Sequence, residues 1–449
     1  MSRKETGFSN RIDWSLVWIY LLLASIGIMA IFAVTYREGD PVTASFLGFK
    51  TDYSKQLYFF FISVVLGIFI LLTDSKFFTA TANLWYAVGI VTLLLVFPLH
   101  SNVKGTKSII RFGGFNFQPA DFCKLCVCLA LAKYISLPNM DFSKTRSQLI
   151  AAGLALLPAF MSIAQSETGL ALVYFSFFVV MYREGLPSTI LVVGFFVGAI
   201  AVCTLLVDKT LLLIAIAVIT GIIAFIVWQR KRQRLSAAVP VLFIGVLAAL
   251  FVGVGVPIIF KNVMKLYQVE RIYSTVGREV PEEYILAHKK ELNSPETTKK
   301  DKDAGDYNVK QSKIAIGSGG VLGKGLLKGT QTRYEFVPEQ RTDFIFCTIG
   351  EGFGFVGTSV VMLIYLLLLF RIIAIAERQR SVFSRCYAYG VAAVFFFHIV
   401  INVCMTVGLA PVIGIPLPFI SYGGTSLLTF SIMLAILVRL DADRQMVLR

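Results

Sequence analysis

Apolar runs of about 20 residues recur from one end of the chain to the other and alternate with polar connections. At about 1.5 Å per helical residue this length matches the hydrocarbon thickness of a bilayer, so each run predicts a membrane-spanning helix. The pattern predicts about twelve such helices, at residues 14–35, 56–74, 78–99, 119–136, 148–165, 168–182, 187–207, 209–229, 236–260, 344–376, 386–409 and 418–440.

Composition supports the same fold class. Of the 449 residues, 56% are hydrophobic, and the mean hydropathy is +0.75. Soluble proteins have a smaller apolar share, about 45–50%, so this class is excluded. We expect an all-α polytopic membrane protein of about 10–12 transmembrane helices with one large extracytoplasmic loop. The expected divisions are N-terminal membrane helices at 1–260, the loop at 261–343 and C-terminal membrane helices at 344–449.

The distribution of basic residues predicts the orientation of the chain. Basic clusters at residues 144–146, 230–234 and 378–385 follow the fourth, eighth and tenth spans. With the predicted spans, these clusters and both termini lie on one side, which the positive-inside rule makes cytoplasmic. The polar segment before the first span contains no cleavage site, so we expect that span itself to direct insertion.

Two connections on the opposite side, 100–118 and 261–343, also carry many lysines and arginines, and the chain has a net charge of +15. An anionic ligand near the outer leaflet, such as a phosphorylated lipid, explains cations that are kept outside. We apply this explanation to residues 313–341. For the mixed-charge stretch 279–306, a solvated, flexible insertion is the simpler interpretation.

The segment from Tyr307 to Thr342 is rich in glycine and basic residues. Its GSGGVLGKG stretch, residues 317–325, is not a nucleotide-binding P-loop, because Ser318 and Gly325 stand where that motif needs Gly and Ser or Thr. Glycines still allow backbone N–H groups to approach a phosphate closely. Long loops of special composition are frequent sites of binding and chemistry, so we expect the functional site here.

A few charged or titratable side chains lie within the predicted spans, including Asp121, Lys124, Glu351 and His398. Each is costly in hydrocarbon and should face a cavity or a partner. Asp121 and Lys124 are three residues apart on a helix, which allows them to pair. For His398 we expect a hydrogen-bonded contact between helices.

Several motifs occur in a characteristic order: FQPADFCKL, QSKIAIGSGGVLGKG, GTQTRYEFVPEQRTDFIF and GIPLPFISYGGTS. In these motifs, and over nearly its whole length, the chain resembles the SEDS family of bacterial cell-wall proteins, named for shape, elongation, division and sporulation. The resemblance implies the SEDS fold and a peptidoglycan glycosyltransferase that polymerises lipid II into glycan strands for cell elongation and rod shape. The implied location is the bacterial cytoplasmic (inner) membrane, with both termini cytoplasmic and the active site extracytoplasmic.

The resemblance also implies a catalytic aspartate upstream of the QSKIAIGSGG block. Counting back from Gln311 places Asp301 at that position, and Asp303 is the second choice. A carboxylate there would accept the proton of the sugar hydroxyl that attacks the donor. An insertion at about residues 279–300 separates this stretch from the matching region upstream.

The family motifs imply further substrate-binding residues. Cations would stabilise the diphosphate that leaves, and polar groups would bind sugar or peptide. These residues are Lys107, Arg111, Gln118, Lys124, Gln311, Ser312, Lys313, Lys324, Glu339, Asp343, Ser421 and Tyr422. For Glu339 and Asp343 a structural hydrogen-bonding role is equally compatible with the sequence.

The implied partners are lipid II, an undecaprenyl-diphosphate-linked glycan, a class B penicillin-binding protein and the membrane, without nucleic acid. A divalent cation, Mg²⁺ or Mn²⁺, is an open alternative in which Asp301 is a ligand instead of a base; we expect no nucleotide or organic cofactor. Two other functions stay open at this point: a lipid II flippase or transporter, and a non-catalytic scaffold for the penicillin-binding protein.

Overall fold

The structure is a computed structural model of the whole chain. It describes residues 12–37, 46, 48–99, 101–103, 106–112, 115–165, 167–230, 235–264, 266–275, 280–288 and 304–444. Within these ranges the chain is helical, apart from turns, irregular connections and short antiparallel strands in the order β1-β2-β3. The predicted class, an all-α polytopic membrane protein, is confirmed.

The chain divides into two compact units. The first comprises Met1–Pro187 and Val309–Arg449, and the second comprises Ser188–Asn308. Residues 309–343, the second part of the predicted loop, belong to the first unit, and their backbone bonds α18.

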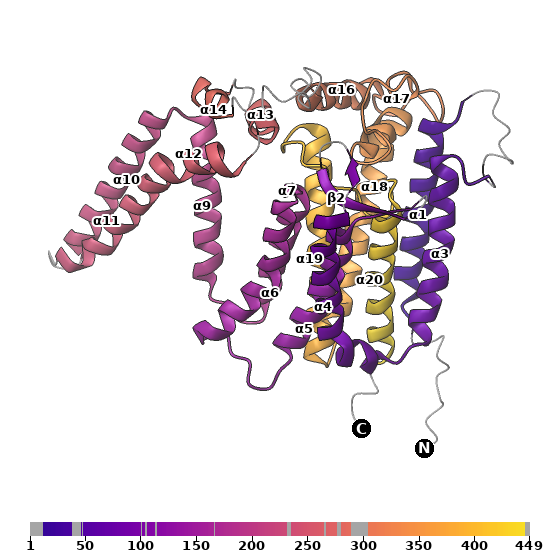
Figure 1. Cartoon of the computed structure of the whole chain (residues 1–449), viewed down its shortest axis with the longest axis horizontal. Coiled ribbons are helices and arrows are strands. Elements are labelled where there is room, and N and C mark those ends of the chain that lie inside the picture. Colours follow the sequence, from indigo (N-terminus) through magenta and orange to yellow (C-terminus); the bar gives the residue numbers. More distant parts are fainter. Residues whose placement is uncertain are drawn as a thin grey trace. The chain divides into compact units, whose positions relative to one another are not determined.

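The first unit contains most of the helices and the strands (Figure 1). Their bounds are α1 Trp14–Thr35, α3 Asp52–Leu72, α4 Ser75–Leu99, β1 Ser101–Val103, β2 Thr106–Phe112, β3 Phe115–Phe117, α5 Pro119–Ile135, α6 Thr145–Ala164, α7 Thr168–Tyr174 and α8 Phe177–Arg183. Next in the chain are α16 Ala304–Ser318, whose first five residues belong to the second unit, α17 Thr330–Arg333, α18 Ile345–Glu377, α19 Val382–Val407 and α20 Gly424–Ala442.

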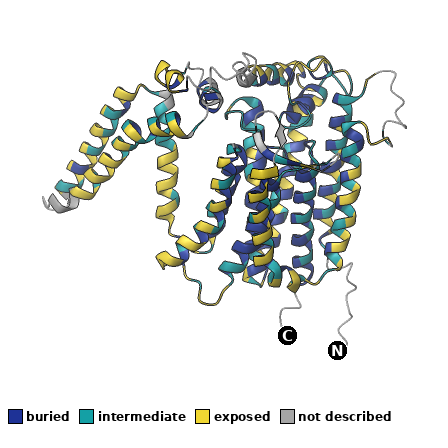
Figure 2. Cartoon of the chain, in the orientation of Figure 1, coloured by how far each residue is buried: buried dark blue, intermediate teal, exposed yellow. Residues whose placement is uncertain are grey.

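The core of the first unit lies around α5, α19 and α20. Nearly every residue of α5 is buried, and α19 packs on both α5 and α20. Helices that are hydrophobic all round belong in such a position, whereas outer helices expose one apolar side to lipid. Figure 2 shows this contrast between the buried central helices and the exposed residues of α3.

Two glycines show how closely the core packs. Gly27 of α1 lies against the segment that precedes α20, since a Cβ there would meet the carbonyl oxygen of Phe419 at 2.6 Å. Gly67 of α3 faces α20 with more room, and the nearest atom to its added Cβ is that of Ala435 at 3.9 Å. Helix packing in membranes depends on such small residues, because they let backbones approach.

The second unit contains α9 Ser188–Leu206, α10 Lys209–Arg230, α11 Leu235–Leu250, π-helical turns at Phe251–Gly255 and Ile259–Val263, α12 Val256–Ile258, α13 Leu266–Thr275 and α14 Glu282–Ala287. Helices α10 and α11 pack on one another. A small aromatic cluster of Phe260, Tyr273 and Tyr284 joins its last turns.

Among the described residues, nine helices are long and apolar enough to span a membrane. Shorter apolar helices lie at the three remaining predicted spans, 119–136, 168–182 and 187–207. The predicted span 119–136 corresponds to the 17-residue α5, and 168–182 is split into α7 and α8. The last helix starts at Gly424 instead of residue 418, because prolines and glycines interrupt the preceding segment.

The two ends of the first unit differ in character. The start of α1 and the end of α20 meet at one end, where Arg378 bonds both Asp13 and Asp441. The strands, α17 and the start of α18 lie at the other end. There Thr425 of α20 donates a hydrogen bond to the carbonyl oxygen of Asn116 in β3 at 2.7 Å. The start of α1 and the end of α20 thus lie at the same end of the first unit.

The close approach at Gly27 predicts a stability effect. Gly27→Ala should destabilise the folded protein by about 1–3 kcal/mol, because backbone atoms of residues 419–420 would have to move. Gly67→Ala is the matched control, and its added methyl group finds ordinary contact distance. Thermal unfolding in detergent measures both, and an equal unfolding temperature for the two variants would contradict the packing described here.

Candidate functional site

The glycine-rich segment packs backbone to backbone on the first turns of α18. Lys324 and Gly325 donate N–H groups to the carbonyl oxygens of Glu351 and Gly352, at 3.0 and 2.8 Å. In return, the N–H groups of Phe355 and Val356 bond the carbonyl oxygens of residues 320 and 321 at 2.9 and 3.1 Å. These backbone hydrogen bonds therefore fix the loop against the first turns of α18.

Glycine is required where these backbones meet. A Cβ on Gly323, whose φ is +80°, would lie 2.2 Å from the carbonyl oxygen of Gly352. Gly354 has a φ of +63° inside α18 and kinks the helix there. Because the N–H groups of Lys324 and Gly325 are used internally, close packing explains these glycines better than a phosphate cradle does.

A buried carboxylate organises the next part of the loop. The Glu351 side chain, 0% exposed, accepts a charged hydrogen bond from Lys324 Nζ at 2.8 Å. It also accepts bonds from the backbone N–H groups of Gln331 and Thr332 at 2.9 and 2.8 Å. The hydroxyl group of Thr330 is 3.3 Å away. A buried charge needs this degree of compensation, so Glu351 fixes the loop conformation.

Residues 339–343 connect this loop to the segment that precedes α20. Ser421 Oγ donates to the carbonyl oxygen of Thr342 at 2.6 Å, and the N–H of Tyr422 donates to that of Arg341 at 2.9 Å. Thr342 Oγ1 also donates to Glu339 Oε2 at 3.1 Å. The structure thus brings together four predicted residues, namely Glu339, Asp343, Ser421 and Tyr422.

Two amide side chains reinforce this connection. Asn402 of α19 donates to the carbonyl oxygens of Asp343 and Ile415 at 2.8 and 2.6 Å. Gln56 of α3 clamps the 421–423 turn, because it donates to the carbonyl oxygen of Ser421 and accepts from the N–H of Gly423, both at 3.2 Å. The loop is therefore fixed by helices from both halves of the chain.

An ion-pair group borders the same region. Arg341 contacts Asp52 at 2.8 Å and Glu335 at 2.6 Å. Burial, followed by the negative charge of Asp52, raises the pKa of Tyr422 to about 12, so its phenol stays protonated at neutral pH. Because two carboxylates already bind Arg341, this group fixes the loop and does not offer a surplus positive charge.

Backbone strain is concentrated in the same loop. Of the described non-glycine residues with positive φ, three lie between α16 and α18: Leu327, Glu335 and Glu339, at φ of 65°, 58° and 57°. A further one, Phe419 at 65°, precedes α20. Such conformations cost of order 1–3 kcal/mol each and gather at functional sites, so this observation supports the loop as the candidate site.

Lys124 lies elsewhere, in the helical interior. Its Nζ is 2.6 Å from Asp121 Oδ1 and 2.7 Å from His398 Nε2, and it sits 4.8 Å from the centre of the Phe430 ring. The expected pairing of Asp121 with Lys124 is confirmed, as is a hydrogen-bonded contact for His398. Since Lys124 is 0% exposed, its immediate role here is to join α5 to α19.

Three further predicted residues lie on α16, and a fourth, Gln118, directly precedes α5. Ser312 is buried and donates to the carbonyl oxygen of Thr406 at 2.9 Å, which ties α16 to α19. The side chain of the neighbouring Lys313 lies against Gly408, at the end of α19. Gln311 is partly buried. Gln118 is fixed through its N–H to Thr425 Oγ1 at 3.3 Å.

Arg111 is exposed on β2, whereas the side chain of Lys107 lies outside the described part of the structure. The catalytic candidate Asp301 and its alternative Asp303 also lie outside the described residues, just before α16 begins at Ala304. No group of three or more His, Cys, Asp or Glu suited to hold a metal occurs among the residues that the structure describes.

Three residues that shape this site, Asp52, Gln56 and Asn402, were not predicted, whereas Arg341 was part of the basic region 313–341. A signal was present for two of them, because Gln56 and Asn402 are amides in predicted spans, where unpaired polar groups are costly. Glu351 was recognised as a costly intramembrane charge, but its partners were not identified. They come from the loop, and only the folded structure brings them close.

A family model described as a cell cycle protein, of the FtsW, RodA and SpoVE type, matches residues 13–211 and 207–446. The peptidoglycan glycosyltransferase RodA of Treponema pallidum (strain Nichols) is 30% identical over 452 aligned residues, which cover 96% of this chain and 97% of the relative. The peptidoglycan glycosyltransferase MrdB of Escherichia coli (strain K12) is 29% identical, with coverage of 80% and 78%.

Two solved structures are similar throughout. One, described as "Structural coordination of polymerization and crosslinking by a peptidoglycan synthase complex", has a TM-score of 0.66 at 22% identity and coverage of 97% and 98%. The rod shape determining protein RodA of Thermus thermophilus has a TM-score of 0.59 at 21% identity, with the same coverage. These similarities establish a shared fold.

The bonds of Glu351 predict a measurable change in loop dynamics. In Glu351→Ala, the amide hydrogens of Gln331 and Thr332 lose their acceptor, which costs about 1–3 kcal/mol per group. Hydrogen exchange at these two amides should therefore be about tenfold faster or more. Glu335→Ala removes a half-exposed carboxylate from the same loop and is the control. Equal exchange in both variants would contradict the role given to Glu351.

Proposed function

This chain belongs to the FtsW/RodA/SpoVE family of cell cycle proteins, and we propose that it is a peptidoglycan glycosyltransferase. It is a multi-pass bacterial membrane protein, and it polymerises lipid II into glycan strands for cell elongation and rod shape. The observation that carries this proposal is the match to a relative named peptidoglycan glycosyltransferase RodA along 96% of the chain. The loop between α16 and α18, fixed on the membrane helices, supports it.

The proposed orientation follows from charge. The end of the first unit where α1 begins and α20 ends carries the basic segment 378–385, so the positive-inside rule assigns it to the cytoplasm. The glycine-rich loop then faces the outer side of the cytoplasmic membrane. Lipid II and the undecaprenyl-diphosphate-linked strand would reach it laterally from the outer leaflet.

In the proposed reaction, the 4-hydroxyl group of the lipid II GlcNAc attacks the anomeric carbon of the lipid-linked glycan with inversion. Asp301 accepts the hydroxyl proton as the new bond forms, a contribution of about 10²–10⁴-fold. The leaving group is an undecaprenyl diphosphate, whose growing negative charge needs nearby cations. Arg111 and Lys313 are exposed and suited to this role, together with Lys107. Lys324 instead balances Glu351.

Two further elements of the proposal concern partners and metal. A class B penicillin-binding protein is the proposed partner, since polymerised strands must be crosslinked and the family resemblance implies such a pair. In the alternative to the general-base role, a divalent cation, Mg²⁺ or Mn²⁺, would stabilise the diphosphate, and Asp301 would serve as its ligand.

The decisive test uses labelled lipid II and the purified full-length chain, with a cognate penicillin-binding protein whose own activity is blocked. Wild type should form glycan polymer. Asp301→Ala should reduce polymerisation by at least about 10²-fold without loss of folded protein, and Asp303→Ala, two residues away, should retain most of it. If no polymer forms from wild type with its partner present, the proposal fails in favour of the transporter or scaffold function.

Removal of divalent cations distinguishes the two roles of Asp301. If Asp301 is a general base, treatment with EDTA should leave the rate of polymerisation within about twofold of the untreated rate, because no step depends on a metal. The measurement is the initial rate with EDTA and after addition of Mg²⁺ or Mn²⁺. A complete loss that either ion restores would instead establish the metal-ligand role.

A further inference from the structure

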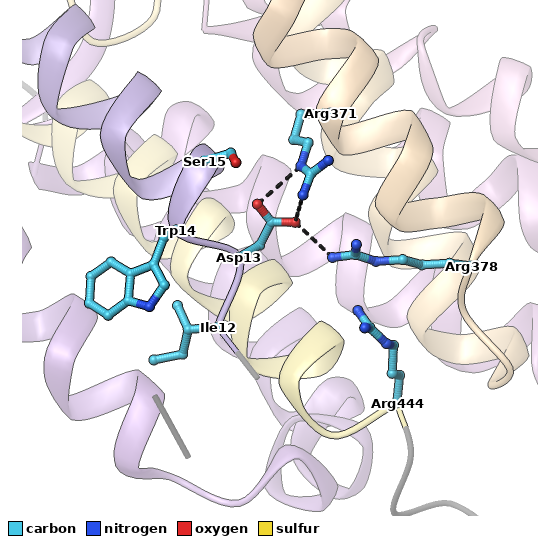
Figure 3. A pocket seen from close by; sticks show the side chains of 7 residues that line it. All are labelled: Ile12, Asp13, Trp14, Ser15, Arg371, Arg378 and Arg444. Atoms are coloured by element: carbon cyan, nitrogen blue, oxygen red, sulfur yellow. Dashed lines mark hydrogen bonds and ion pairs between the residues drawn. The ribbon is translucent and has the colours of Figure 1, made fainter. Parts of the chain in front are cut away.

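A second charged site lies at the end of the first unit opposite the glycine-rich loop. It is a pocket of about 270 Å³, the volume of about nine water molecules at roughly 30 Å³ each. Figure 3 shows Asp13 between the start of α1 and three arginines that converge from α18 and the end of α20. The lining residues are Ile12, Asp13, Trp14, Ser15, Arg371, Arg378 and Arg444.

Two buried carboxylates hold the arginines in place. Asp13, 1% exposed, accepts from Arg371 Nε at 3.0 Å and from Arg378 Nη2 at 2.8 Å. Asp441, 0% exposed, accepts from Arg378 Nε at 2.8 Å and from Arg444 Nη1 at 3.0 Å. Each of the three arginine side chains is itself 31–39% exposed. The positive groups are therefore oriented by the protein and still face the pocket.

Among the residues that the structure describes, the charges at this site do not cancel. Three guanidinium groups face two carboxylates, because the neighbouring Asp443 is already paired with Arg439 at 2.9 Å. Within the described ranges, Nη1 of Arg371, Nη1 of Arg378, and Nε and Nη2 of Arg444 form no hydrogen bond to the protein. One surplus positive charge and several donors remain, and planar guanidinium groups match phosphate oxygens in geometry.

The border of the pocket is apolar and exposed. Trp14 lines it and is 49% exposed, and Trp18, one helical turn further along α1, is 65% exposed. Phe370, directly before Arg371 on α18, is 60% exposed. Tryptophan is enriched where membrane helices cross the interface between lipid and water, so this end of the helices lies at headgroup depth. The site therefore combines anion-binding donors with a surface suited to acyl chains.

We propose that this pocket binds the phosphate group of an anionic phospholipid, with the acyl chains lying along the Trp14–Trp18 face of α1. In the orientation proposed above, this is a lipid of the cytoplasmic leaflet. The phosphodiester accepts hydrogen bonds from Arg371 and Arg444, and Arg378 joins them while it bridges the two carboxylates. A free phosphate ion offers the same oxygens but cannot use the apolar border, so the lipid is the better match.

The test measures lipid binding to the purified full-length protein by native mass spectrometry. Phosphatidylglycerol is compared with phosphatidylcholine, and inorganic phosphate is titrated separately. Arg371→Gln and Arg444→Gln each remove one donor group from the pocket. Arg380→Gln is the matched control, since Arg380 is an exposed cation at the same helix end that does not line the pocket.

Wild type and Arg380→Gln should prefer phosphatidylglycerol over phosphatidylcholine, and each pocket variant should bind phosphatidylglycerol about fivefold more weakly. Equal preference in all four proteins would overturn the proposal. So would binding of inorganic phosphate that depends on Arg371 and Arg444 while phosphatidylglycerol binds no better than phosphatidylcholine, since this result would assign the pocket to a soluble anion.

A second measurement needs no variant and covers the case in which the glutamine variants do not fold. A phosphatidylglycerol analogue with a photoreactive group near its headgroup is crosslinked to wild type in vesicles, and the labelled peptides are identified. Labelling should concentrate on residues 12–18 and 370–378. Labelling confined to other parts of the chain would reject the site.

Discussion

The buried carboxylate of Glu351 determines the conformation of the loop on which the proposed function depends. A charge at the start of a membrane helix is expensive, and this one is compensated by Lys324 and by two backbone N–H groups of α17. All three donors come from the loop between α16 and α18. Any movement of the loop would leave the buried carboxylate unpaired. The free-energy cost of that state therefore holds the loop in one conformation.

Buried carboxylates compensated by cations also occur at the other end of α18. There Asp13 and Asp441 are buried, and Arg371 and Arg378 of α18 compensate them. One long helix therefore carries a carboxylate bound by a loop near its first turn and cations bound by carboxylates near its last turn. Both groups fix α18 to neighbouring elements, and both leave polar groups exposed at the two surfaces of the membrane.

Sequence patterns predicted the elements well and their connections only in part. Bilayer-length apolar runs identified the long helices, since their length is set by the membrane and not by neighbours in the fold. The split of α7 from α8 and the burial of α5 were not predicted, because they depend on what packs around them. The close pairing of Asp121 with Lys124 followed from their spacing on one helix, whereas the contact of Lys124 with His398 joins distant parts of the chain.

For the candidate site, the motifs identified the loop, but sequence alone did not indicate which residues hold it and which face a substrate. Ser312 and Ser421 bond backbone carbonyl groups inside the fold, and Lys324 balances Glu351. Such roles depend on tertiary distances that no spacing in the sequence encodes. The central claim is that the loop held by Glu351 carries out glycosyl transfer. Its most direct test is the polymerisation of labelled lipid II by wild type and by Glu351→Gln, both with the blocked partner protein. Our account predicts polymer from wild type and at least about tenfold less from folded Glu351→Gln, and equal rates in the two proteins would contradict it.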